Sequence, residues 1–291
     1  MPTKLSVSII GPGKVGLTLA VLLRRAGWPV AIGGRDVSRA AQAAAAVGAE
    51  VGSGLAHQVA PLGQLVLLTV PDDAIAGVCA ELAAAGAFEP GAVVAHCSGA
   101  LASDVLGPAR RAGCHVASLH PLQTFPSVEA GVRRFAGTYC FCEGDEQALA
   151  VLEPLAAELG GRPVRLRTDG KLLYHAAAVM ACNYFVALLD AAVATAGQAG
   201  IAPEQALAAL EPLVRATLEN VMRLGPAKAL TGPIARGDAA LVARQARELA
   251  AADARLGAIY RLLGGWTVDV ALRKGTIDQA RAADLRKVLG E

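Results

Sequence analysis

An apolar run near the start of the sequence leads directly into three regularly spaced glycines. Residues 5–10 have the length and β-branched content of a buried strand, and Gly11, Gly13 and Gly16 follow with the spacing G-x-G-x-x-G. An amphipathic stretch begins at once, so the glycines stand between a predicted strand and a predicted helix. In that context Gly11 permits a tight turn, Gly13 lets a pyrophosphate approach the backbone, and Gly16 allows the helix to pack closely on the strand. The motif predicts a dinucleotide-binding unit.

The glycine turn also indicates which part of the ligand it holds. A helix that begins here presents free N–H groups and the positive end of its dipole, which suits phosphate groups. An ordinary turn between strand and helix is the alternative interpretation. Residues of the turn expected to bind the cofactor are Gly11, Pro12, Gly13, Lys14, Val15 and Gly16.

Short apolar runs alternate with alanine-rich stretches through the first half of the chain. The expected strands are 5–10, 29–33, 49–52, 65–70, 92–97, 115–119, 137–142 and 163–166. The expected helices between them are 14–26, 37–47, 73–85, 102–112 and 145–159. This alternation predicts an α/β fold with a doubly wound parallel sheet of the Rossmann type.

The strand patterns stop at Asp169, and the rest of the chain reads as an all-helical domain. Gly225-Pro226 and Gly232-Pro233 mark breaks between helices. We therefore expect a nucleotide-binding domain over residues 1–168 and a helical domain for substrate binding and dimerisation over residues 169–291. The expected helices are 170–198, 203–223, 226–231, 238–263, 266–273 and 277–288.

Composition narrows the range of partners. The 27 basic and 25 acidic residues give a net charge of +2, which indicates neither a nucleic-acid partner nor an acidic one. Charged residues make up 18% of the chain, below the average of roughly 25%, so we expect part of the surface to be hidden in a homodimer. We identify no apolar run free of glycine, proline and charge that approaches the roughly 20 residues of a membrane helix, so we expect no membrane partner. The cysteines, described next, favour a cytoplasmic location.

The six cysteines form no C-x-x-C pair and lie mostly in apolar runs, which predicts reduced, buried thiols. Cys140 and Cys142 alternate along one predicted strand and share a face. Core packing is the favoured interpretation of this pair, and a metal or redox pair is the alternative. We expect no metal site.

The end of the second predicted strand distinguishes between the two nicotinamide cofactors. An acidic residue there binds the ribose of NAD, whereas arginine accommodates the 2′-phosphate of NADP. The acidic position falls near Gly34, and Arg35, Ser38 and Arg39 follow within one helical turn. Two arginines and a hydroxyl can hold a phosphate, which favours NADP(H). Asp36 keeps NAD(H) open as the less favoured cofactor, and two solvated arginines are the alternative interpretation.

The fourth predicted strand ends in Val70 and Pro71, just before a new helix. Ligands of open α/β sheets bind beyond the carboxyl ends of the strands. We therefore expect both residues to lie against the cofactor, and Asp72 or Asp73 to cap the helix.

Four further segments carry a resemblance to a known family. They are Ala95-His96-Cys97-Ser98-Gly99-Ala100, Leu119-His120-Pro121-Leu122-Gln123-Thr124-Phe125, Lys171-Leu172-Leu173-Tyr174-His175 with Asn183, and Ala229-Leu230-Thr231-Gly232-Pro233. With the glycine turn, they make the chain similar to the superfamily of 6-phosphogluconate dehydrogenase, β-hydroxyacid dehydrogenases, pyrroline-5-carboxylate reductase and ketopantoate reductase. The chain more closely resembles oxidoreductase-like proteins with a Rossmann-like and a DUF2520 domain, a family without an assigned substrate.

The resemblance implies a Rossmann domain, an all-helical C-terminal domain and a homodimer built through the latter. It also implies a substrate role for Ser98 and Gly99, because β-hydroxyacid dehydrogenases hold the substrate carboxylate with Ser-Gly-Gly in this region. The third position here is Ala100, a small departure. A serine that caps a helix is the alternative interpretation of Ser98.

His120 follows a predicted strand end in a loop stiffened by Pro121. A histidine at that edge suits acid–base chemistry or substrate binding, with Gln123 and Thr124 as further hydrogen-bonding groups for the substrate. A buried histidine that fixes the loop is the alternative.

Lys171 begins the first helix of the second half, where related dehydrogenases place a lysine that polarises the substrate. His175 lies about 40° from Lys171 around that helix, so both point to one side, and Asn183 lies on the flank. The β-hydroxyacid dehydrogenase pattern has asparagine where this chain has His175, which puts the standard hydroxyacid mechanism in doubt. The candidate catalytic residues are therefore Lys171, His175, His120 and Asn183, and a solvated lysine is the alternative interpretation of Lys171.

The leading hypothesis is an NADP(H)-dependent oxidoreductase that transfers a hydride to or from a small keto, imino or hydroxy acid in a cleft between the domains. A nicotinamide-nucleotide-binding sensor or regulatory protein without turnover is the alternative. Hydride exchange with a deazaflavin is a third option, which the long helical domain disfavours.

Overall fold

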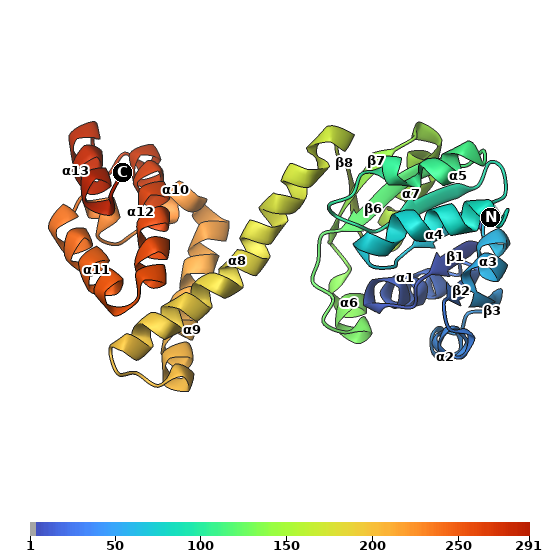
Figure 1. The fold of residues 1–291 in the computed structure, drawn as a ribbon, viewed down its shortest axis with the longest axis horizontal. Coiled ribbons are helices and arrows are strands. Elements are labelled where there is room, and N and C mark those ends of the chain that lie inside the picture. The colour runs from blue at the N-terminus through green and yellow to red at the C-terminus, as the bar shows by residue number, and fades with distance from the viewer. Residues whose placement is uncertain (1–3) are drawn as a thin grey trace. The chain divides into compact units, whose positions relative to one another are not determined.

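The computed structural model describes residues 4–291. Contacts divide the chain into two compact units, one ending at Ala181 and the other spanning Cys182–Glu291. The first contains the sheet, drawn in blue to green in Figure 1, and the second is helical.

Eight strands form one sheet in the order β3-β2-β1-β4-β5-β6-β7-β8, with the crossover of a doubly wound fold next to β1. The pairing is parallel, as predicted, except between β6 and β7, which run antiparallel. This pairing places His120 directly opposite Phe141. The strands are β1 (Val7–Ile10), β2 (Val30–Gly34), β3 (Gly52–Leu55), β4 (Leu65–Leu68), β5 (Val93–His96), β6 (His115–Pro121), β7 (Tyr139–Gly144) and β8 (Arg162–Arg165).

Alternating strand residues enter two separate apolar cores, one on each face of the sheet. Val7 and Ile9 of β1 join the first core, whereas Ile10 joins the second. The first core is covered by α1 (Lys14–Arg25), α2 (Val37–Val47) and α7 (Glu146–Glu158); the second by α3 (Ala56–Val59), α4 (Asp72–Ala84) and α5 (Gly107–Arg111). Helices on both faces confirm the predicted Rossmann-type fold.

Two short helices, α3 and α6 (Val128–Arg134), lie in segments for which the sequence predicted no helix. Each is too short to show helical periodicity, and α6 begins at a Ser127 cap that accepts a hydrogen bond from the Ala130 N–H. The third strand lies at 52–55 rather than 49–52, because Gly52 pairs with Ala31 of β2.

The second half contains six helices among the described residues. They are α8 (Lys171–Gln198), α9 (Pro203–Leu224), α10 (Pro226–Ala229), α11 (Ala239–Ala252), α12 (Ala254–Lys274) and α13 (Gln279–Leu289). Val242, Val268 and Leu285 belong to the core where α11, α12 and α13 pack.

The predicted break near Gly264 and Gly265 is wrong. Helix α12 runs through both glycines, and the chain breaks instead at Asp253, whose carboxylate accepts hydrogen bonds from the Arg255 and Leu256 N–H groups. The glycine pair serves packing, because a Cβ on Gly264 would lie 2.7 Å from the Leu289 side chain.

Helix α8 is apolar and largely exposed. A 31-residue helical segment, Thr168–Gln198, is long and apolar enough to cross a membrane by length and composition alone, which is weak evidence. The expectation of no membrane partner therefore stays a prediction. Met222 and Trp266 are also exposed, on α9 and α12. The homodimer stays a prediction.

Candidate functional site

The glycine turn between β1 and α1 is held by a threonine from the neighbouring strand end. Gly11 has φ +110°, a backbone conformation that side chains rarely adopt. The Thr69 hydroxyl, just past β4, donates a hydrogen bond to the Gly11 carbonyl oxygen at 2.7 Å. A Cβ on Gly16 would lie 2.5 Å from that same carbonyl oxygen and would also overlap the Thr69 hydroxyl. Gly11 and Gly16 therefore maintain the close packing of the turn.

Gly13 has a different environment from the other two glycines. A Cβ at Gly13 would meet only the Thr69 carbonyl oxygen, 3.9 Å away. Gly13 is also the N-cap of α1 and provides no side-chain hydrogen bond. The first N–H groups of α1 are thus left to bind a ligand, in a cradle that a side chain would fill, which fits the phosphates of a dinucleotide.

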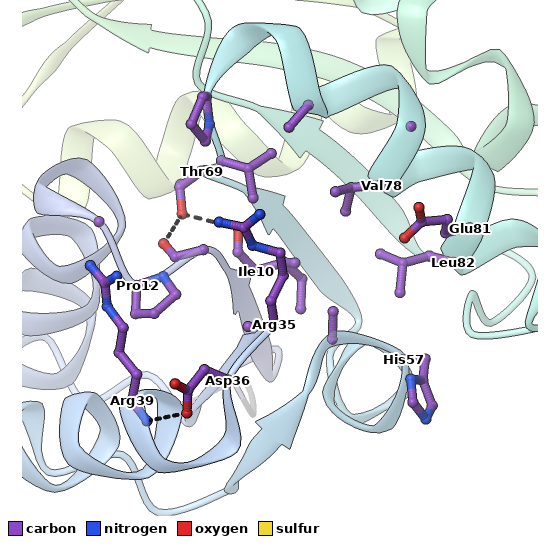
Figure 2. A pocket seen from close by; sticks show the side chains of 18 of the residues that line it. Ile10, Pro12, Arg35, Asp36, Arg39, His57, Thr69, Val78, Glu81 and Leu82 are labelled. Carbon is purple, nitrogen blue, oxygen red and sulfur yellow. Dashed lines mark hydrogen bonds between the residues drawn. The ribbon is translucent and has the colours of Figure 1, made fainter.

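A pocket of ≈ 1180 Å³ lies beside the glycine turn, at the carboxyl ends of β1, β2 and β4. Figure 2 shows it from close by. Apart from the arginines, six residues that the sequence predicted to bind the cofactor line this pocket: Gly11, Pro12, Gly13, Gly34, Val70 and Pro71.

Two arginines extend into this pocket, Arg35 toward Thr69 and Arg39 beside Pro12 (Figure 2). Asp36 lies between them in the sequence, but its carboxylate caps α2 by accepting a hydrogen bond of 3.0 Å from the Arg39 N–H. One oxygen of the Asp36 carboxylate is therefore engaged with the backbone, although Asp36 also lines the pocket. Among the predicted cofactor residues, Ser38, Lys14, Val15 and Gly16 do not line the pocket.

The far wall of the pocket consists of residues that no sequence pattern singled out. His57 on α3 and Val78, Glu81 and Leu82 on α4 line it together with Ala56. In Figure 2 these side chains lie beyond Arg35 as seen from Pro12. Helix α3 has only four residues and shows no periodicity, so no local pattern predicts that this segment approaches the pocket.

Ser98 lies just past β5 and is hydrogen-bonded within the protein. Its hydroxyl donates to Asp72 at 2.7 Å and accepts from the Ala100 and Leu101 N–H groups at 3.1 and 3.0 Å. The Ser98 N–H in turn donates to Nδ1 of buried His96. The serine thus fixes the loop after β5 to the start of α4.

Four aromatic side chains meet beside Gly99. The Nδ1 atom of His120, in β6, lies 2.7 Å from the hydroxyl oxygen of Tyr174, on α8. The rings of His120 and His175 are 6.2 Å apart, and those of Phe141 and Tyr174 are 4.4 Å apart. A Cβ on Gly99 would lie 2.8 Å from His120 Nε2 and 2.5 Å from His175 Cδ2, so only glycine leaves room for both imidazoles.

Lys171 is not part of this aromatic cluster and instead binds residues of the sheet. Its side chain is 2% exposed, and its ammonium group donates to Ser118 and to Glu143, the latter at 3.3 Å. Glu143, on β7, also accepts hydrogen bonds from Ser103, Ser118 and Thr168. The first turn of α8 is therefore tied to the sheet by a buried ion pair.

Burial and the Lys171 charge lower the pKa of His120 to about 4, and the same two causes lower the pKa of His96 to about 4. Burial raises the pKa of Tyr174. For Glu143, burial raises the pKa, but hydrogen bonds from Ser118 and Ser103 and the Lys171 charge outweigh it and hold the pKa below 4.5. At neutral pH His120 and Tyr174 are uncharged and Glu143 is ionised.

The remaining predicted site residues are placed elsewhere. The Gln123 side-chain oxygen accepts hydrogen bonds from the Thr124 N–H and hydroxyl, in the loop after β6. Asn183 is exposed on α8 in the second unit. The sequence analysis selected neither Tyr174 nor Glu143 as a site residue, although Tyr174 lies between two residues that it selected.

All six cysteines are free in the described part of the chain. Cys140 and Cys142 are fully buried in β7, and burial raises their pKa values to about 11 and about 12. Protonated, buried thiols fit core packing. Cys182 is exposed, contrary to the expectation of buried thiols for the set. Residues 4–291 contain no group of three His, Cys, Asp or Glu side chains suited to a metal ion.

The sheet with helices on both faces and the glycine turn define the first unit as a Rossmann-type unit, with a pocket at the carboxyl edge of its sheet. A Rossmann-like family model matches residues 1–121, and the domain of unknown function DUF2520 matches residues 138–267. The two models together span most of the chain. The chain thus carries a Rossmann-like domain followed by a DUF2520 domain.

Solved structures with a similar fold include several oxidoreductases. A protein from Thermotoga maritima is 26% identical with a TM-score of 0.72, over 92% of this chain and 99% of that chain. A candidate NADP oxidoreductase from Bacteroides fragilis is 24% identical with a TM-score of 0.69, over 90% and 96%. A reductive aminase from Aspergillus terreus, solved with NADPH and ethyl-5-oxohexanoate, is 16% identical with a TM-score of 0.59, over 99% and 93%. No curated protein matches the sequence.

Proposed function

We propose that this protein is an NADP(H)-dependent oxidoreductase that acts on a small keto, imino or hydroxy acid. The observation that carries the proposal is the pocket beside the glycine turn, with Arg35 and Arg39 in its wall and Asp36 committed to capping α2. Names of proteins with a similar fold, an NADP oxidoreductase and a reductive aminase among them, agree with this class.

Different residues of the pocket fit different parts of the cofactor. The N-terminus of α1 and the Gly13 cradle hold the pyrophosphate, and Arg35 and Arg39 hold the 2′-phosphate through charge-assisted hydrogen bonds. The bound cofactor supplies or accepts the hydride. His120 and His175 are the groups of the first unit that we assign to the substrate, because their rings converge beside Gly99.

Turnover is tested by following NADPH absorbance with a panel of 2-oxo acids, the same acids with ammonia or a primary amine, and cyclic imines. The reverse reaction is followed with NADP⁺ and 2-hydroxy acids. We expect at least one class to be converted, and conversion to fall about 100- to 1,000-fold in His120→Ala, the usual cost of removing one hydrogen-bond donor from the reacting group. NADPH binding without conversion of any class would favour the sensor alternative.

Cofactor choice is tested by titrating NADPH and NADH against the native protein and against Arg35→Glu and Arg39→Glu. We expect native protein to bind NADPH more tightly, and each substitution to weaken NADPH by about 10- to 100-fold, the effect of losing a charge-assisted bond. Binding of NADH should change much less, because NADH lacks the 2′-phosphate.

Arg25→Glu is the matched control, since Arg25 is exposed in the last turn of α1 and does not line the pocket. It makes the same charge change and should leave both affinities as they are. Tighter binding of NADH by the native protein, or equal loss in the control, would contradict the assignment of NADP(H).

A further inference from the structure

Tyr174 has one hydrogen-bond partner among the described residues, and that partner is a candidate substrate-binding group. Its hydroxyl lies 2.7 Å from His120 Nδ1, across 54 residues of sequence. No described residue is hydrogen-bonded to the other ring nitrogen, Nε2. That nitrogen faces Gly99, at the carboxyl end of β5, where a Cβ would lie 2.8 Å from it.

The direction of the hydrogen bond follows from the two groups that share it. A phenol is a better donor than acceptor, and the unprotonated nitrogen of a neutral imidazole is a strong acceptor. Burial disfavours the charged form of both side chains, so neither tyrosinate nor imidazolium competes with the neutral pair. Tyr174 therefore donates to Nδ1, and the imidazole proton is placed on Nε2.

The Tyr174 ring is held in place by a ring contact and by the anchoring of the helix that carries it. Phe141 lies opposite His120 in the β6–β7 register, and its ring packs against Tyr174 at 4.4 Å. Lys171, one turn earlier on α8, is held in the sheet by Glu143 and fixes the start of the helix. The side chains that face His120 are thus Tyr174 on α8, His175 on the same helix and Phe141 on β7.

We propose that Tyr174 is a positioning residue that holds His120 in the Nε2–H tautomer, so that His120 presents a neutral hydrogen-bond donor to the carbonyl or imine group of the substrate. This inference rests on the proposed oxidoreductase function. In that role His120 polarises the C=O or C=N bond without being charged, and Nε2–H is the atom that meets the substrate.

The tautomer is measured directly by ¹⁵N–¹H correlation spectra of the imidazole rings in the full-length protein, with and without NADPH. The chain has five histidines, and His120→Gln assigns the signal of interest. We expect the native protein at pH 7 to show His120 neutral with its proton on Nε2. A proton on Nδ1 would overturn the proposal.

Tyr174→Phe removes the donor and keeps the ring that packs on Phe141. We expect the His120 tautomers to mix and the His120 pKa to rise above its native value, because the lost hydrogen bond stabilised the neutral ring. With a converted substrate, kcat should fall about 10-fold while the KM for NADPH stays the same. Unchanged tautomer populations in this variant would also overturn the proposal.

Tyr139→Phe is the matched control, because Tyr139 is an exposed tyrosine at the start of β7 that lies over Arg162. It should leave the His120 spectrum and kcat unchanged. The spectra and the substrate panel separate two failures. The expected tautomer with no converted substrate would refute the oxidoreductase function alone, whereas conversion with the wrong tautomer would refute the role of Tyr174 alone.

Discussion

Replacing Lys171 by methionine should lower the free energy of unfolding by about 3–5 kcal/mol, the usual cost of removing one member of a buried ion pair. Lys171 and Glu143 are each about 2% exposed, so the carboxylate left behind has no access to solvent in place of the ammonium group. Urea denaturation at pH 7 measures the difference. The double variant Lys171→Met with Glu143→Gln should recover part of the loss.

The loss in free energy of unfolding caused by Lys171→Met should depend on pH. The native Glu143 pKa is held below 4.5, so its ionised form contributes stability above that pH, which is lost on acidification. Without Lys171 that contribution shrinks, so the difference between native protein and Lys171→Met should be smaller at pH 4 than at pH 7. A constant deficit across this range would show that lost packing dominates.

Arg215→Met supplies the comparison for an exposed ion pair. Arg215 and Glu211 form an i, i+4 pair on the surface of α9. Its removal should change the free energy of unfolding by about 0.5 kcal/mol or less. An equal loss in Arg215→Met and Lys171→Met would contradict the structural importance of the buried network.

Gly13→Val should reduce NADPH affinity by at least about 100-fold, equivalent to about 2.7 kcal/mol, with little change in thermal stability. An added Cβ at this position would meet only the Thr69 carbonyl oxygen, at 3.9 Å, and would occupy the cradle at the start of α1. Fluorescence titration with NADPH and a thermal melt of the same sample separate the two effects. A large loss of stability in Gly13→Val would show that this glycine serves packing instead.

Gly16→Ala should behave differently, because its Cβ would overlap the Thr69 hydroxyl and the Gly11 carbonyl oxygen. We expect a loss of about 1–3 kcal/mol in stability from overpacking, together with weaker NADPH binding as the turn shifts. Gly197→Ala is the control within a helix, since no atom lies within 4 Å of its added Cβ. It should be neutral or slightly stabilising.

Much of the Rossmann unit could be predicted from local pattern. Each of the eight predicted strands overlaps an observed one, because alternating or continuous apolar runs between turn residues depend only on neighbours in the sequence. Helix α12 shows where the local signal misleads. Two consecutive glycines, Gly264 and Gly265, are typical of a break between helices. Here, however, the Leu289 side chain packs against Gly264 and leaves no room for a Cβ.

The candidate site also combines features that the sequence predicts with features that only the structure shows. Arg35 and Arg39 follow β2 at a spacing visible in the sequence, and the structure places both in the pocket. The sequence also contains Asp36, but only the start of α2 shows that its carboxylate is engaged with the Arg39 N–H. Ser98 likewise has hydrogen-bond partners as far away as Asp72.

By itself the sequence determined the glycine turn, the order of the strands along the chain, and the arginines beside the pocket, since each is encoded within a few residues. Only the tertiary structure decided that β7 runs antiparallel to β6 and that Glu143 meets Lys171, 28 residues away. It also decided that Tyr174 meets His120 across 54 residues. Such contacts depend on the register of strands and the docking of a helix, which no short window of sequence contains.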